Sequence, residues 1–221
     1  MQGRRRYAGA CRAATDEVRP PQARLRVCNT FVDPSSSSGR PDLEQLVTEL
    51  CPALFAWAQL RLPAALRPIV AVEDVVQEIW LRVVRIYQHS FRPGQGSPRA
   101  WVFAVAKLVL LEVERAAHGR ARRGSAPGGT TWQRAVAAVP DSVTSLTQRL
   151  SRDERIRRFV ERVQELDDDD RRLLVFCGIE EMPQHEAARR LGLSAEAAAK
   201  RWQRLRERAR GWDSVQDLLT G

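Results

Sequence analysis

The sequence predicts an all-α protein built from two small helical domains that a flexible linker joins. Apolar residues recur at helical spacing in two blocks, residues 41–123 and residues 151–213. A stretch with three Gly and two Pro, residues 124–150, separates the blocks. The second block ends in two short helical patterns around a glycine, which is typical of a helix-turn-helix.

The basic charge of the chain is concentrated outside the two blocks. The 221 residues have a formal net charge of +9 and a pI of about 10.5, which indicates a polyanionic partner. The net charge is +5 over residues 1–40 and +4 over residues 120–150, whereas residues 41–119 and 151–221 are each neutral. With many Arg and a run of Ser, residues 1–40 are expected to form a disordered basic tail.

The first block, 41–123, contains three helical patterns. Apolar residues keep helical spacing over 43–58 and again over 75–84, where polar residues fill the opposite face. Two Gly and two Pro in residues 89–98 predict a loop. Pro98 suits the first turn of the next helix, 98–117, which is nearly apolar as far as Leu111 and is therefore expected to be largely buried.

Residues 124–150 contain Gly124, Gly128, Gly129 and Pro140, and they predict a flexible linker with one short helical piece at 132–139. The block that follows begins with helical patterns over 156–163 and 173–176. Asp167 to Asp170 lie where the second of these helices begins, since carboxylates there cap free amides and oppose the helix dipole.

Residues 182–210 predict the helix-turn-helix. Gly192 supplies the turn, because a residue without Cβ takes a positive φ easily, and Ser194 is placed to cap the second helix. Helical spacing predicts an inward face made of Ala198, Trp202, Leu205 and Ala209. The outward face then consists of Lys200, Gln203, Arg204 and Glu207. An exposed basic helix of this kind suits the major groove of DNA, and residues 214–221 are a short C-terminal tail.

Other classes of function find no support in the sequence. The most apolar run, Ala100 to Leu111, is shorter than the roughly 20 residues that a membrane-spanning helix needs. The four Cys are scattered without a Cys/His pattern, so no zinc site or disulfide framework is expected, and a reducing cytoplasm fits. The three His are dispersed and no phosphate-binding Gly loop precedes a helix, so an enzyme, a cofactor and a metal are not expected.

Two motifs of the first block carry a family resemblance. They are AVEDVVQEIWLRVV at residues 71–84 and RAWVFAVAKLVLLEVER at residues 99–115. These motifs are similar to regions 2.2 to 2.4 of sigma-70-like RNA polymerase sigma factors of the extracytoplasmic-function (ECF) type. Residues 166–208, with Leu191-Gly192-Leu193-Ser194, resemble region 4 of the same family. Both motif sets in this order, with a linker between them, are more specific than either alone.

The resemblance implies core RNA polymerase and promoter DNA as partners. Region 2 of the family binds the polymerase, and the matching positions here are Asp74, Gln77, Glu78 and Arg82. A polar row beside an apolar stripe can dock a partner helix, with specificity from charge. An anti-sigma factor is a further partner that the family implies, although no residue in this chain identifies one.

The resemblance also implies where promoter DNA binds. Residues 89–123 match the part that captures unstacked bases of the −10 element, and the candidates there are Phe91, Arg92, Arg99, Lys107, Arg115, Arg120, Arg122 and Arg123. Trp101 could stack on a base, but a Trp on an apolar helix is more typical of a core. The positions matching −35 recognition are Ala199, Lys200, Gln203 and Arg204 at the bases, with Arg201 and Arg206 at the phosphates.

We therefore expect a cytoplasmic transcription initiation factor that directs core polymerase to promoters, assists in melting them and catalyses no reaction of its own. The alternative is a helix-turn-helix DNA-binding regulator that does not act as a sigma factor and uses residues 41–119 for sensing or dimerisation. The polar row at Asp74, Gln77 and Glu78 argues against it, because a ligand pocket would not need that pattern.

Overall fold

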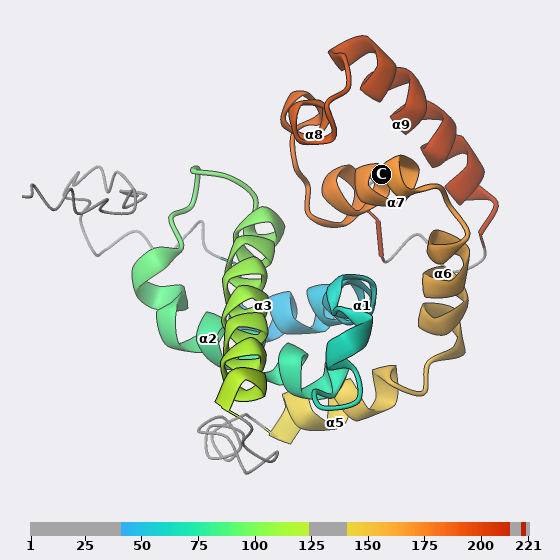
Figure 1. Cartoon of the computed structure of the whole chain (residues 1–221). Helices are drawn as coiled ribbons and strands as arrows, with labels where there is room; N and C mark the ends of the chain where they lie inside the picture. Colours follow the sequence, from blue (N-terminus) through green and yellow to red (C-terminus); the bar gives the residue numbers. More distant parts are fainter. Residues whose placement is uncertain (1–40, 124–140, 213–217, 220–221) are drawn as a thin grey trace, which may run out of the picture. The chain divides into compact units, whose positions relative to one another are not determined.

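Helices form the part of the chain that the computed structural model describes, residues 41–123, 141–212 and 218–219 (Figure 1). Those ranges contain no strand, so the all-α prediction is confirmed. All of them belong to one unit by contact, Ser38–Gly221. The predicted basic tail, residues 1–40, lies outside the described residues.

The first block consists of α1 (Leu43–Arg61), a 3₁₀ turn (Ala64–Leu66), α2 (Val72–Ser90) and α3 (Pro98–Arg123). α2 packs against both α1 and α3. The core between them contains the fully buried side chains of Trp57, Trp80 and Phe103, and the rings of Trp57 and Phe103 meet edge to face at 5.8 Å. The large aromatic area buried here explains why three helices of this length hold together.

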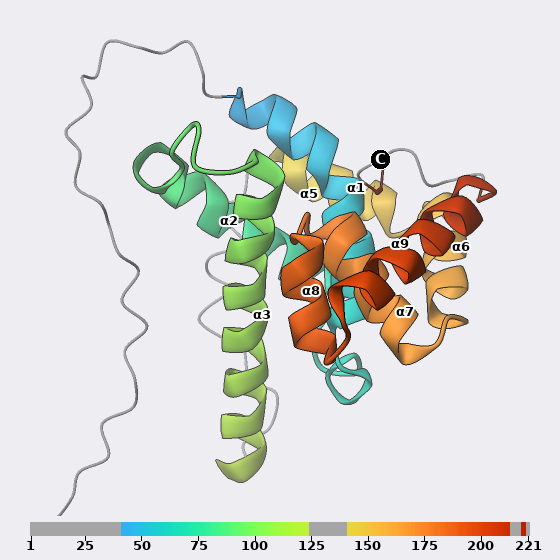
Figure 2. The ribbon, with the colours of Figure 1, turned by 90° about the horizontal axis from the view of Figure 1, so that it is seen from above.

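One face of α3 corrects a prediction. Its apolar run was expected to be largely buried, but Leu108 is 58% and Leu111 41% exposed, and Ala104 on the same face is also exposed. The three residues follow i, i+4, i+7 spacing, so they form a stripe on the side that α1 and α2 do not cover. Figure 2 shows the C-terminal turns of α3 extending away from the other helices.

The predicted linker is also partly wrong, because residues Asp141–Leu150 form helix α5. Val143, Thr147 and Leu150 lie on one face of α5 and are buried, and this face packs against α1 and α2. The spacing of these residues is helical, yet the Gly- and Pro-rich stretch before them dominated the sequence pattern. The helical piece expected at residues 132–139 lies outside the described residues.

The second block consists of α6 (Glu154–Gln164), α7 (Asp168–Leu173), a π-helical turn η2 (Leu174–Ile179), α8 (Gln184–Leu191) and α9 (Ala195–Arg210). Asp153 and Asp167 cap α6 and α7, since their carboxylates accept from the backbone N–H groups of Arg155 and Asp170, each at 2.9 Å. The expectation that the acidic run caps a helix is therefore confirmed.

The two blocks share one apolar core in this structure. α1 contacts α5, α6 and η2, and a single cluster of buried residues includes members of both blocks, such as Trp57 and Phe159. Leu218, which was expected to lie in a C-terminal tail, is 2% exposed and belongs to the same cluster. The residues that separate the blocks in sequence therefore do not separate them in space.

Candidate nucleic-acid interface

The turn between α8 and α9 has the geometry that the sequence predicts. Gly192 ends α8 in the left-handed conformation, with φ of 67°, and the N–H of Leu193 donates to the carbonyl of Ala188 at 2.9 Å. Ser194 caps α9 by accepting from the N–H of Ala197 at 3.1 Å. Glycine and serine thus fix the direction in which α9 leaves the turn.

The predicted faces of α9 are confirmed. The inward residues are all buried: Ala198, Trp202, Leu205 and Ala209. The outward positions assigned to base reading are all exposed: Ala199, Lys200, Gln203 and Arg204. Lys200 pairs with Glu196 at 2.7 Å and Gln203 donates to Glu207 at 3.2 Å, both on the helix surface. Surface pairs of this kind are weak, so both side chains can turn to a nucleic acid at little cost.

The two arginines assigned to phosphates are engaged within the protein. Arg201 Nη1 lies 3.0 Å from Asp169 and within 4.0 Å of Asp167 and Asp170, so it holds α9 against the start of α7. The backbone N–H of Asp170, followed by Arg201, holds the pKa of Asp167 below its usual range. The guanidinium of Arg206 lies 5.8 Å from the ring centre of Trp202, and its buried Nε has no hydrogen-bond partner.

The loop after α2 surrounds a pocket of about 270 Å³. Phe91, Arg92, Gln95 and Trp101 are among its lining residues. Phe91 is only 3% exposed because its ring stacks on Tyr87 at 5.4 Å and meets Trp101 edge to face at 5.6 Å. Phe91 is therefore part of the core in this structure, whereas Arg92 is exposed at the rim.

Arg99 and Lys107, both expected at −10 DNA, face the second block instead. Arg99 donates from Nε to the carbonyl of Ile179 at 2.8 Å and from Nη2 to that of Leu218 at 2.5 Å. Burial lowers the pKa of Arg99. Lys107 Nζ lies 3.0 Å from Glu180 Oε2, and this carboxylate is completely buried.

Of the remaining candidate cations of α3, the structure describes the side chain of Arg115 alone. Arg115 is exposed near the protruding end of the helix. Arg120, Arg122 and Arg123 belong to the last turns, and their side chains lie outside the described part of the chain. The exposed stripe Leu108–Leu111 precedes them on α3. This end of the helix thus combines apolar surface with basic sequence.

The four polar residues predicted to form a row on α2 differ in their exposure to solvent. Asp74 is exposed, and partial burial, followed by the neighbouring Glu73, raises the pKa of its carboxyl. Arg82 lies 4.0 Å from Glu78 and pairs with Glu112 of α3 at 2.8 Å. Gln77, in contrast, is 5% exposed beneath α5 and donates to Thr147 Oγ1 at 3.3 Å. Asp74 and Arg82 are therefore accessible to a partner, whereas Glu78 is only 16% exposed and its Oε2 is buried.

Sequence reasoning missed the buried carboxylate of Glu180. Its Oε1 accepts from Trp57 Nε1 at 2.8 Å, while Oε2 pairs with Lys107, so it joins α1 and α3 to the end of η2. The neighbouring Glu181 has φ of 54°, which is rare for a residue with a Cβ, and accepts from Ser97 Oγ. The one available signal was a pair of acids that directly follows the apolar run Leu173 to Ile179.

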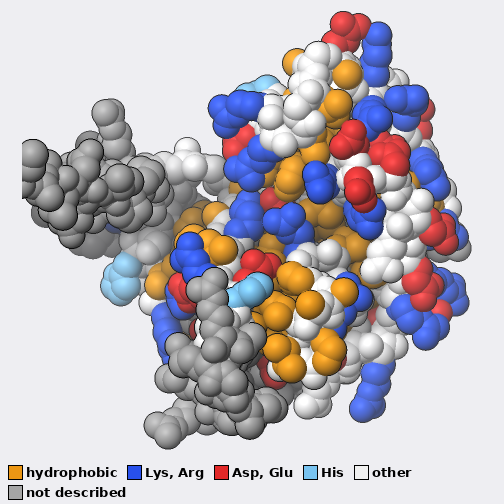
Figure 3. All heavy atoms as spheres, viewed as in Figure 1, with side chains coloured by type: hydrophobic (Ala, Val, Ile, Leu, Met, Phe, Trp, Pro, Cys, Tyr) orange, Lys and Arg blue, Asp and Glu red, His pale blue; other side chains and the backbone are white. Residues whose placement is uncertain are grey.

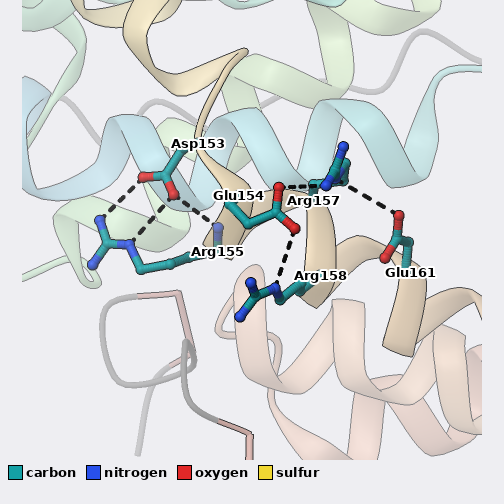
Figure 4. Close-up of polar contacts among 6 residues, drawn as sticks. All are labelled: Asp153, Glu154, Arg155, Arg157, Arg158 and Glu161. Atoms are coloured by element: carbon teal, nitrogen blue, oxygen red, sulfur yellow. Dashed lines mark hydrogen bonds and ion pairs between the residues drawn. The ribbon is translucent and has the colours of Figure 1, made fainter.

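Basic residues elsewhere in the second block are balanced by acids beside them. Figure 4 shows this at the start of α6, where Glu154 pairs with Arg158 at 3.2 Å and with Arg157, and Asp153 pairs with Arg155 at 3.1 Å. In Figure 3, acidic side chains likewise lie among the basic ones over the upper helices, and hydrophobic side chains gather in a patch nearer the lower part of the face. Net charge therefore does not distinguish α9 from the other helices of the second block. What distinguishes α9 is its row of exposed polar side chains on a helix that can fit the major groove.

The described residues contain no group of three or more His, Cys, Asp and Glu that could hold a metal ion. Among the helices described here, none has both the length and the apolar character required to cross a membrane.

Comparison with known proteins finds a match in the first block. Residues 46–121 match the family model for sigma-70 region 2. Among solved structures, CnrH in complex with the cytosolic domain of CnrY is similar at 24% sequence identity and a TM-score of 0.35. That similarity covers 75% of this chain and 82% of the CnrH chain. No curated protein matches the chain.

Proposed function

We propose that this protein is a sigma factor of the ECF type, which binds core RNA polymerase in the cytoplasm and directs it to promoters. The observation that carries the proposal is the match of residues 46–121 to sigma-70 region 2. The roles of single residues rest on side chains within that range and on α9.

The surface of α2 is the proposed polymerase-binding site. Asp74 is exposed, and the side chains of Glu78 and Arg82 are 16% and 33% exposed. Two carboxylates and a guanidinium in a row offer charge complementarity to a partner helix and would limit the choice of partner. Gln77 joins this surface only if α5 moves away from it.

Helix α9 is the proposed reader of −35 DNA. Lys200, Gln203 and Arg204 are exposed on one face, and Arg and Gln offer the paired groups that match guanine and adenine edges in the major groove. Ala199 gives this face an apolar position that suits contact with a thymine methyl group. The wide spacing of −35 and −10 DNA requires α9 to act at a distance from region 2.

The loop and helix after α2 are the proposed −10 site. Arg92 and Arg115 are exposed, and the pocket beside Arg92 is lined by aromatic and polar groups that suit an unstacked base. Phe91, Arg99 and Lys107 can contribute only after they leave their present contacts. An anti-sigma partner belongs to the same proposal, since sigma factors of this type are commonly held by one.

Co-purification with core RNA polymerase tests the proposal. The full chain is mixed with purified bacterial core enzyme, and the complex is isolated by size exclusion. We expect a complex that Glu78→Ala combined with Asp74→Ala weakens, while Glu186→Ala on the surface of α8 leaves it unchanged. A chain that binds duplex DNA without binding the polymerase would instead identify a helix-turn-helix regulator.

A further inference from the structure

The end of η2 and the two residues after it make most of the polar contacts between the two blocks. Residues 179–181 provide a backbone carbonyl, a buried carboxylate and a second carboxylate, and these meet Arg99, Lys107 and Ser97. Trp57 Nε1 adds a fourth contact from α1 at 2.8 Å. Three consecutive residues of the second block thus bind three elements of the first.

These contacts occupy groups that the −10 site needs. A carboxylate paired with Lys107 neutralises a cation in the way that a DNA phosphate would. Arg99 is held by two carbonyls and cannot reach a strand while those bonds last. Because one side chain cannot satisfy both partners, DNA and residues 179–181 must compete for the same surface.

This inference rests on the proposed function, because promoter DNA is the ligand that these contacts would exclude. The contacts themselves are observed independently of that function. We propose that residues 179–181 form an autoinhibitory latch, in which Glu180 and Glu181 take the place of nucleic-acid phosphates and keep the first block from binding single-stranded DNA. Opening the latch frees Arg99 and Lys107. It also separates the second block from α1 and α3, so that each block can reach its own DNA element.

The burial of Glu180 explains why the latch is sensitive to a single substitution. Its side chain is completely buried, and both of its oxygens have partners, Trp57 and Lys107. Its partner Lys107 is 31% exposed, so once the carboxylate is neutral the ammonium group can turn to solvent or to a DNA strand. Glu180→Gln keeps the shape of the side chain and removes the charge, so it weakens the latch without a large change in volume.

Glu186→Gln is the matched control. It removes the same charge from the same block, but the ion-pair partners of Glu186 are Arg189 and Arg190 on its own helix. A general electrostatic gain in DNA affinity would therefore appear in both variants. An effect of the latch would appear only in Glu180→Gln.

The test measures both opening and binding in the full chain. Dyes are attached at Ala65→Cys and Gln184→Cys, which are exposed positions in different blocks, with Cys11 and Cys28 replaced by Ser. Energy transfer reports the distance between the blocks. Fluorescence anisotropy reports the affinity for a mixed-sequence single strand of about 20 nucleotides.

We expect Glu180→Gln to lower the energy transfer and to bind the single strand about tenfold more tightly than the unsubstituted chain, a size typical of coupling between sites. Glu186→Gln should change neither by more than about twofold. Unchanged energy transfer in folded Glu180→Gln would overturn the latch. Lower energy transfer with no gain in affinity over Glu186→Gln would overturn its inhibitory role.

A second arm of the experiment tests the latch even if Glu180→Gln does not fold. Ser97→Cys and Glu181→Cys are joined by a short reagent that a reductant cleaves, which fixes the contact between the loop and the latch. We expect the joined form to bind the single strand at least tenfold more weakly than the same protein after cleavage. Equal affinities would overturn the proposal. Neither arm contains polymerase, so failure of the sigma-factor proposal in the co-purification experiment is distinguishable from failure of the latch.

Discussion

Arg204 is the residue whose side chain bears most directly on base reading, because it is exposed on the outward face of α9. We predict that Arg204→Ala weakens discrimination between a cognate −35 sequence and its single-base variants by about 1–3 kcal/mol. Arg210→Ala is the control, since it removes the same charge from the same helix at a different angle. Binding isotherms on a set of duplexes measure both, and an equal loss on every duplex would assign Arg204 to phosphates.

Cys51 and Cys177 make the free energy of unfolding depend on pH in the alkaline range. Burial raises the pKa of both thiols from 9.0 to about 11. In the unfolded chain the thiols ionise near pH 9, whereas the folded chain keeps them protonated until about pH 11. The stabilisation is therefore complete below pH 9 and is lost as the pH rises toward 11.

Urea unfolding at half-unit steps between pH 8 and pH 11 measures this effect. We predict that the free energy of unfolding falls over the window, and that Cys51→Ala makes the fall shallower even if it lowers stability at every pH. A slope that Cys51→Ala leaves unchanged would mean that Cys51 is solvated in the folded protein.

The turn between α8 and α9 requires one residue in the left-handed conformation. Gly192 has φ of 67° with no neighbouring atom near a Cβ, so Gly192→Ala costs backbone strain alone. We predict a loss of about 1 kcal/mol in the free energy of unfolding. Gly211→Ala, where φ is −81°, should change it by less than about 0.5 kcal/mol. Similar losses in both variants would show that the turn does not require the left-handed conformation.

Helix α5 depends on its contact with α2. Gln77 is buried under α5 and donates to Thr147, so Gln77→Ala removes a packed side chain and that hydrogen bond. We predict that it lowers the free energy of unfolding by about 1–2 kcal/mol. Asp74→Ala on the same helix should stay within about 0.5 kcal/mol, because Asp74 is exposed. Equal effects in urea unfolding would place Gln77 on an open surface.

The molecule as a whole differs from the sequence prediction in how its blocks meet. Gly192, Ser194 and the buried face of α9 were predictable, because each depends on neighbours within a few residues. Arg99 was assigned to DNA, yet its carbonyl acceptors are 80 and 119 residues away, and no local pattern encodes such a contact. Glu180 is buried for the same reason, with Trp57 as a partner 123 residues away.

The exposure of the apolar stripe on α3 could not be predicted for a similar reason. Its apolar pattern predicted burial, but no element covers Leu108 and Leu111, which remain exposed. Periodicity reports which side of a helix is apolar and says nothing of whether another element covers every part of it. For α5 the reverse holds, since a short amphipathic pattern was obscured by the Gly and Pro residues before it.

Run-off transcription shows whether the chain acts as a sigma factor. Purified bacterial core RNA polymerase is combined with the full chain on a library of genomic fragments, and the 5′ ends of the transcripts are mapped. We expect discrete start sites that require the chain and that weaken when Glu78→Ala is combined with Asp74→Ala. Transcripts whose start sites are the same with and without the chain would contradict this expectation.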